Sequence, residues 1–127
     1  MKKLVLGFLI AMSLMLLSTT AFAQEYLSPE YNNCVREFYD PAMYNWLSYE
    51  NVCGHGISIV YIPYNPGYGG SQMDLGPGGH NSTGYSRGEV QQKGGFELYI
   101  CPAGYVPVDA NNGYVTRVNT QFRCKKN

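Results

Sequence analysis

Cysteine and histidine are the residues of this chain best suited to nucleophilic or metal chemistry, and both are few. The candidates are Cys34, Cys53, Cys101, Cys124, His55 and His80. Free thiolates with imidazoles would suit cysteine catalysis or a zinc site. The order of Cys53, His55 and His80 matches none of the paired spacings that zinc ligands usually show. We therefore expect no metal site and no cofactor.

A serine hydrolase would need a nucleophile, a base and an orienting carboxylate. His80 offers a base, and Asp74 or Glu89 offers a carboxylate. The Gly-x-Ser-x-Gly turn that exposes a nucleophilic serine does not occur in the sequence. We therefore expect a protein without catalytic activity, and a small secreted hydrolase centred on His80 is the alternative.

The first 23 residues have the order of charge, apolar run and small residues of a secretory signal. Lys2 and Lys3 come first, an apolar stretch follows over 4–17, and Ala21-Phe22-Ala23 ends the segment. We expect cleavage after Ala23, which leaves a signal peptide over 1–23 and one domain over 24–127. The apolar stretch is shorter than the roughly 20 residues of a membrane-spanning helix. The sequence thus predicts a secreted or periplasmic protein with no stable membrane anchor after cleavage.

Four cysteines in an oxidising compartment predict two disulfides. Asn111-Asn112-Gly113 lies midway between Cys101 and Cys124, and an Asn-Gly step suits a tight hairpin turn. Strands on either side of that turn would bring these two sulfurs together and leave Cys34 to pair with Cys53. Two nearby prolines weaken the hairpin, so the nested pairing, Cys34 with Cys124 and Cys53 with Cys101, stays open.

The charge balance is even, with nine Lys and Arg against nine Asp and Glu. Lys2 and Lys3 belong to the predicted signal peptide, so the domain itself is slightly acidic. Contacts to phosphate dominate binding to nucleic acids. We therefore expect no nucleic-acid partner.

Short strands separated by Gly/Pro turns dominate the rest of the chain. The segment 56–62 is the clearest strand, and it is apolar on both sides, which predicts a central position. Further strands are expected over 72–75, 85–91, 96–101 and 114–123. Asp40-Pro41 predicts the start of one brief helix, because Asp caps helices and Pro suits their first position. This pattern predicts a mainly β fold: a small antiparallel β-sandwich or barrel with one short helix and two disulfides.

Tyrosine is unusually common, with 12 in the chain. Tyr61, Tyr64, Tyr68 and Tyr85 lie in or beside glycine-rich turns, where rigid amphipathic rings suit binding. Tyrosine also favours strands, so these rings would equally well cover a small sheet. We take these four tyrosines and His80 as candidate binding residues. We expect a binding or structural module that contacts a glycan or a protein partner, and a secreted protease inhibitor presenting the loop 64–70 is a second alternative.

The region 46–101 has a recognisable order of motifs. Asn51-Val52-Cys53 is followed by Ile57-x-Ile59, by Leu75-Gly76-Pro77-Gly78 and by Tyr99-Ile100-Cys101. This order resembles small exported bacterial proteins of uncharacterised function, and it is distantly similar to the opening of thaumatin-like β-sandwich proteins. The resemblance implies export and a β-sandwich. It transfers no site, because the many cysteines and the acidic cleft of thaumatin-like proteins have no counterpart here.

Overall fold

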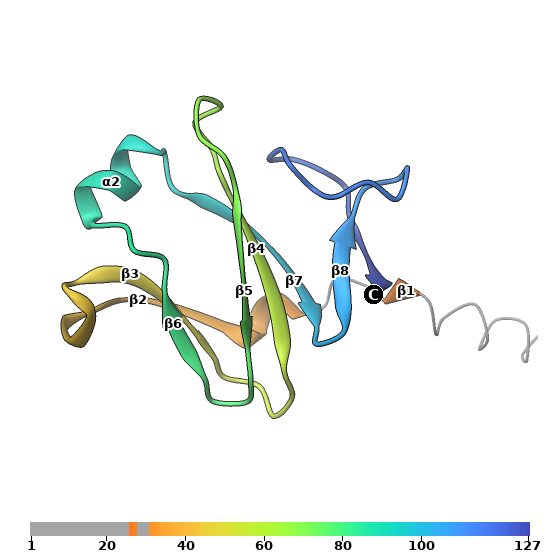
Figure 1. Cartoon of the computed structure of the whole chain (residues 1–127), viewed down its shortest axis with the longest axis horizontal. Coiled ribbons are helices and arrows are strands. Elements are labelled where there is room, and N and C mark those ends of the chain that lie inside the picture. Colours follow the sequence, from red (N-terminus) through yellow and green to blue (C-terminus); the bar gives the residue numbers. More distant parts are fainter. Residues whose placement is uncertain (1–25, 28–30) are drawn as a thin grey trace, which may run out of the picture.

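A computed structural model describes residues 26–27 and 31–127 (Figure 1), so the predicted signal peptide over 1–23 lies outside the described residues. The elements, in chain order, are β1 (Tyr26–Leu27), η1 (Tyr31–Cys34), β2 (Val35–Asp40), η2 (Pro41–Met43), β3 (Trp46–Asn51), β4 (Ile57–Pro63), β5 (Ser71–Leu75), β6 (His80–Ser82), α2 (Arg87–Gln92), β7 (Phe96–Pro102), β8 (Tyr105–Val108) and β9 (Arg123–Lys126).

The described strands form three small antiparallel sheets, with strand orders β1-β9-β8, β2-β3-β6 and β5-β4-β7. In Figure 1 the sheet β5-β4-β7 stands in the middle, with β2 and β3 on one side of it and β8 on the other. The predicted mainly β fold with one short helix and two disulfides is confirmed.

Strand β4 is the central strand, as its two apolar faces predict. Ile57, Ile59 and Tyr61 point to one face, where they pack with Leu47 and Tyr49 of β3 in the larger core. On the opposite face, Ile62 packs with Tyr99 and Val115 in a smaller core, with Val60 and Phe122 against it. A strand buried on both faces needs a cover on each side, and β4 is covered by a sheet on one side and by the chain after β8 on the other.

Asn51 ties the end of β3 to two neighbouring turns. Its side-chain amide donates to the carbonyls of His55 (2.7 Å), Gly76 (3.0 Å) and Leu75 (3.2 Å). Its side-chain oxygen accepts from the backbone N–H of Cys53 (2.9 Å). Asn51 has no exposed surface. Because an unpaired buried amide is costly, these bonds hold the two turns at fixed positions.

Both disulfides have the pairing that the sequence favours, Cys34 with Cys53 and Cys101 with Cys124. The second bridge does not cross the hairpin that was expected to create it. Cys101 lies in β7 and Cys124 in β9, so the bridge joins two different sheets. The Asn-Gly step does make a tight turn, in which the N–H of Asp109 donates to Gly113 O (2.9 Å). Both disulfides indicate a protein of a non-cytoplasmic, oxidising compartment.

The strand predicted over 85–91 is wrong, because this segment contains α2. The Ser86 hydroxyl accepts from the N–H of Glu89, and the Glu89 carboxylate accepts from the N–H of Ser86 (both 3.2 Å). This reciprocal capping box starts a helix, and the Ser-x-x-Glu signal was visible in the sequence. The helix predicted after Asp40 is only the 3-10 turn η2, capped by the Asp40 carboxylate, which accepts from the N–H of Ala42 (2.9 Å).

The strand predicted over 114–123 is also wrong, since only Arg123 of that range lies in a strand. Asn119 has a positive φ of 60°, and the Thr120 hydroxyl donates back to the Arg117 carbonyl (2.7 Å). Both features turn the backbone away from an extended course. The apolar residues Val115, Val118 and Phe122 instead cover β4 and β7.

We predict that mild reduction opens the Cys34–Cys53 bridge before the Cys101–Cys124 bridge. Cys53 is partly exposed, whereas Cys101 and Cys124 have no exposed surface, and thiol exchange needs access to sulfur. Stepwise dithiothreitol treatment, alkylation and peptide mass spectrometry measure the order. Earlier alkylation of Cys101 or Cys124 would contradict it.

Replacing either cysteine pair by serine should lower the free energy of unfolding by about 3 kcal/mol.

Asn51→Ala should lower the free energy of unfolding by about 3 kcal/mol, because three carbonyls, one of them in a fully buried bond, lose their donor and the Cys53 N–H loses its acceptor. Urea unfolding measures this change. Asn65→Ala is the matched control, since the exposed Asn65 amide makes one such bond, to Gln92 O. The control should cost about 1 kcal/mol or less. Equal losses in the two variants would refute the central role of Asn51.

Candidate functional site

The four candidate tyrosines differ in how far their side chains are exposed. Tyr61 is only 6% exposed, and its ring packs against Tyr49 (5.6 Å) and Phe96 (5.5 Å) in the larger core. Its expected place in a binding surface is therefore wrong, because a ring packed inside the core cannot stack on a ligand. Tyr64 and Tyr68 are 47% and 37% exposed and remain candidates.

Tyr85 and Tyr68 are joined through one lysine. The Lys93 ammonium lies 4.0 Å from the centroid of the Tyr68 ring and 4.6 Å from that of Tyr85. Tyr85 also stacks on Phe96 with a centroid distance of 5.7 Å. Such cation–π contacts hold the rings in place. Tyr85 is therefore partly buried against the larger core, and Lys93 connects it to Tyr68, which the loop 64–70 exposes.

The loop 64–70 connects β4 to β5 and is anchored at its base to the segment after α2. The N–H of Tyr64 donates to Gly95 O (3.1 Å), and the N–H of Asn65 donates to Lys93 O (2.9 Å). Gly94 and Gly95 have φ values of 77° and 78°, which side-chain-bearing residues rarely adopt. These glycines let the chain turn back toward the loop. The loop is consequently held at its base, and its tip projects at one end of the molecule (Figure 1).

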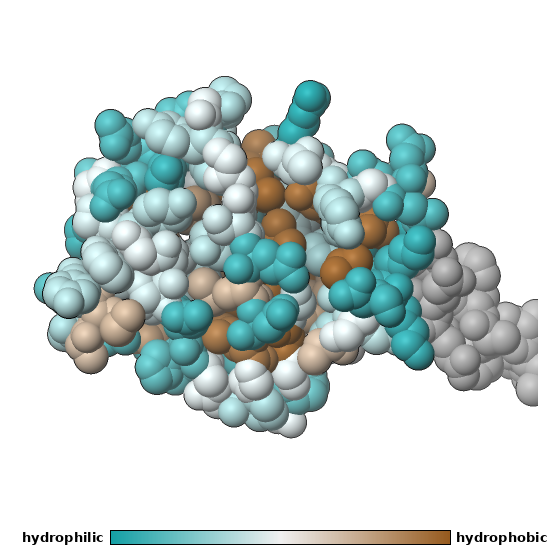
Figure 2. Space-filling model, in the orientation of Figure 1, coloured by the Kyte–Doolittle hydropathy of each residue, from teal (hydrophilic) through white to brown (hydrophobic). Residues whose placement is uncertain are grey.

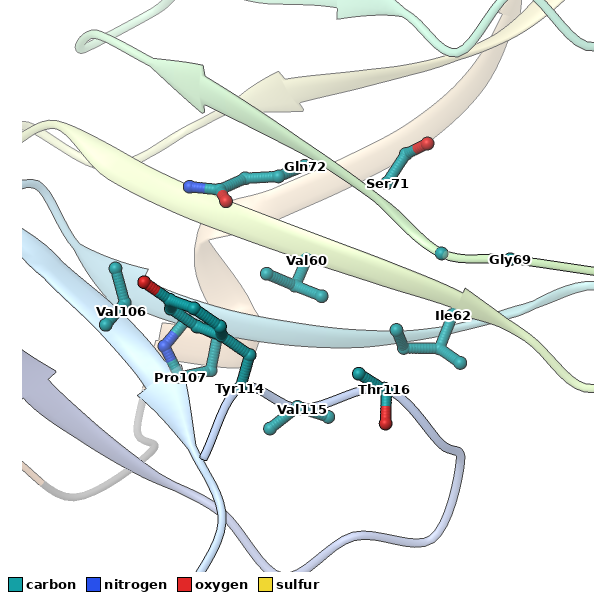
Figure 3. A pocket seen from close by; sticks show the side chains of 11 residues that line it. Val60, Ile62, Gly69, Ser71, Gln72, Val106, Pro107, Tyr114, Val115 and Thr116 are labelled. Carbon is teal, nitrogen blue, oxygen red and sulfur yellow. The ribbon is translucent and has the colours of Figure 1, made fainter. Parts of the chain in front are cut away.

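Two adjoining cavities lie between the β4–β5 hairpin and the segment 114–118. The first, of about 380 Å³, is lined by Val60, Ile62, Gly69, Gly70, Ser71, Gln72, Val106, Pro107, Tyr114, Val115 and Thr116 (Figure 3). The second, of about 530 Å³, is lined by Ile62, Pro63, Tyr64, Pro66, Tyr68, Thr116, Arg117 and Val118. They share Ile62 and Thr116, and we call them together the tyrosine groove.

The two ends of the tyrosine groove differ in chemistry. In Figure 3 the side chains of Val60 and Ile62 point from β4 toward the segment that carries Tyr114, Val115 and Thr116. Figure 2 shows hydrophobic atoms at the surface between the part built on β4 and β5 and the part built on β8. The second cavity adds Arg117 to its tyrosines and prolines. Volumes of this size fall in the range of ordinary ligand pockets.

Tyr114 and Arg117 were not singled out by the sequence analysis. Tyr114 is 76% exposed, and it lines the groove through a segment that was expected to be a regular strand. A large exposed ring after an Asn-Gly turn is the signal that could have identified it. Nothing in the local sequence marks Arg117, since its place beside Tyr64 and Tyr68 depends on tertiary packing.

Glu97 of β7 positions both walls of the second cavity. Its carboxylate accepts hydrogen bonds from the Tyr99 hydroxyl, from the N–H of Asn119 (2.8 Å) and from the Tyr64 hydroxyl (3.2 Å). Partial burial raises the pKa of Glu97, but these three donors outweigh it and lower the pKa below the usual glutamate range. The ionised carboxylate therefore links the loop at Tyr64 to the segment that carries Arg117.

His80 lies outside the tyrosine groove and is exposed on β6. Its ring meets the Phe38 ring edge to face, with the two ring centroids 6.3 Å apart. The two carboxylates that could orient His80, those of Asp74 and Glu89, belong to other parts of the fold. Asp74 is on β5 in a different sheet, and Glu89 caps α2. Among the described residues, no hydrogen bond joins His80 to either carboxylate.

The ligand atoms of Cys34, Cys53 and His55 lie within 4.8 Å of one another. The two sulfurs are bonded to each other, so this cluster presents no thiolate to a metal. It also differs from the set drawn from the sequence, because His80 is not part of it.

Among residues 26–27 and 31–127, no helix combines the length and apolar character that crossing a membrane requires. The chain matches no protein-family model, no curated protein and no solved structure. The resemblance to thaumatin-like proteins therefore stays an expectation.

Glu97→Gln should reduce stability more at neutral than at acid pH. A carboxyl with a lowered folded-state pKa stabilises the fold above its unfolded pKa, about 4.3, and loses this contribution as pH falls through the folded pKa. Urea unfolding at pH 7 should show a loss of about 1 kcal/mol, and the difference from wild type should shrink at pH 3. A difference that is the same at both pH values would contradict the assignment. Tyr64→Phe, which removes one donor, should show a smaller effect of the same sign.

Proposed function

We propose that this chain is a non-catalytic binding module that contacts its partner through the tyrosine groove. Export through the signal peptide at 1–23 would place it in the periplasm or outside the cell. The two disulfides support such a compartment, because they persist where conditions are oxidising.

The observation that carries this proposal is the tyrosine groove itself. Three exposed tyrosines, Tyr64, Tyr68 and Tyr114, border two joined cavities, the first of which has a largely apolar lining. Exposed aromatic rings around a concave apolar surface are typical of recognition sites. The anchored loop base and Glu97 keep this surface ordered before a partner arrives, which reduces the entropy lost on binding.

Protease inhibition is the second candidate, and one observation favours it. The loop 64–70 projects at its tip while its base is held by hydrogen bonds to Lys93 and Gly95. A rigid, protruding loop is the form that such inhibitors present. Inhibition of a panel of serine and cysteine proteases, lost on Tyr68→Ala, would favour this candidate over the groove.

We predict that Tyr64→Ala and Tyr114→Ala each weaken partner binding about tenfold, because buried tyrosines at an interface contribute strongly to affinity. Glycan arrays and peptide libraries are the screens, and titration calorimetry measures affinity for the hits. Tyr44→Ala is the matched control, since Tyr44 is 78% exposed at the turn between β2 and β3. Hits whose affinity is unchanged by both groove variants would refute the proposal.

His80→Ala, assayed on esters, peptides and glycosides, tests the hydrolase alternative. An activity that the wild type shows and this variant lacks would replace the binding proposal.

A further inference from the structure

We infer that the partner of the tyrosine groove is an extended protein segment in which a carboxylate follows closely on an apolar side chain. This inference rests on the proposed binding function and names the chemistry of the partner. The apolar side chain would enter the first cavity, and the carboxylate would pair with Arg117.

The first cavity suits an aliphatic side chain better than a sugar. Val60, Ile62, Val106 and Val115 offer it no hydrogen-bonding side chain. The polar side chains among its lining residues belong to Ser71, Gln72, Tyr114 and Thr116, all of which are exposed, and the Gln72 amide already donates to the Ser58 hydroxyl (3.1 Å). A sugar ring buried against Ile62, Pro107 and Val115 would leave hydroxyls without partners, at about 1–3 kcal/mol for each. An aliphatic side chain carries no such cost.

The charge of the second cavity selects an anion. Arg117 is its only ionised lining residue, and neither cavity is lined by Asp or Glu. Within the described part of the chain, the Arg117 side chain makes no ion pair. The nearby Glu97 carboxylate is already engaged by three donors, and the Lys93 ammonium on the Tyr68 ring adds a second positive charge close by. A guanidinium without a partner beside aromatic rings is well placed to bind a carboxylate.

The spacing of the two cavities sets the spacing of the two ligand groups. Both cavities are lined by Thr116, and Arg117 is the next residue. An extended peptide advances about 3.3 Å per residue. An apolar residue and an acidic residue one or two positions apart can therefore occupy the two cavities together.

Binding of fluorescein-labelled peptide libraries tests this inference. One library of seven-residue peptides fixes Leu followed within two positions by Glu, and its matched library replaces Glu by Gln. We expect the Glu library to bind at least threefold more tightly, with weaker binding at higher salt. Arg117→Gln should remove this preference, and Arg117→Lys should restore part of it. Arg36→Gln is the control for net charge, because Arg36 lies on β2, in the sheet that covers the opposite face of β4.

The possible outcomes separate the inference from the proposed function. Equal binding of both libraries, weakened by Tyr114→Ala, would overturn the acidic preference and leave the binding function intact. Binding of an oligogalacturonate or a neutral oligosaccharide in place of either library would overturn the protein partner in favour of a glycan. An Arg36→Gln effect as large as that of Arg117→Gln would reduce the preference to general charge and overturn the role of Arg117. No binding of peptides or glycans by the folded, oxidised protein would overturn the proposed function together with the inference.

Discussion

The burial of β4 on both faces is the constraint on which the rest of this structure depends. Ile59 and Tyr61 are buried against the sheet β2-β3-β6, and Ile62 is buried on the opposite face. A strand of this kind is stable only when both faces are covered, since apolar side chains are driven from water on each. The second cover is the irregular chain around Val115, which is narrower than a sheet. This chain leaves part of the β4 face open beside Val60, and that open part is the floor of the tyrosine groove.

Covalent and polar anchors hold these covers in place. The Cys101–Cys124 bridge joins the sheet of β7 to that of β9, and Glu97 joins the loop at Tyr64 to the backbone at Asn119. A domain of this size buries only about two thirds of the surface that its unfolded chain exposes, so covalent links add to the stability that its core provides. The same anchors that stabilise the fold thus also fix both walls of the groove, so the site and the stability of the domain share one physical origin.

Local patterns predicted those parts of the fold that depend on local physics. The apolar residues on both sides of 56–62 identified the central strand, and Asp40 was identified as a cap. The observed disulfide pairing was favoured over the nested one, although the Cys101–Cys124 bridge joins two sheets and does not cross the expected hairpin. The segment 85–91 was assigned to a strand without regard to the Ser86–Glu89 capping box, which starts α2. The segment 114–123 was assigned to a strand because its apolar alternation says nothing of the turn at Asn119.

By itself, the sequence determined the mainly β class, the formation of two disulfides and the concentration of tyrosines around glycine-rich turns, because each follows from composition or from neighbours in the chain. Only the tertiary structure decided that Tyr61 belongs to the core while Tyr64 remains at the surface. It also decided that Tyr114 and Arg117 border the same groove as Tyr64. The physical reason is that exposure depends on which face of β4 is covered and by what, and the covering segments lie far away in sequence.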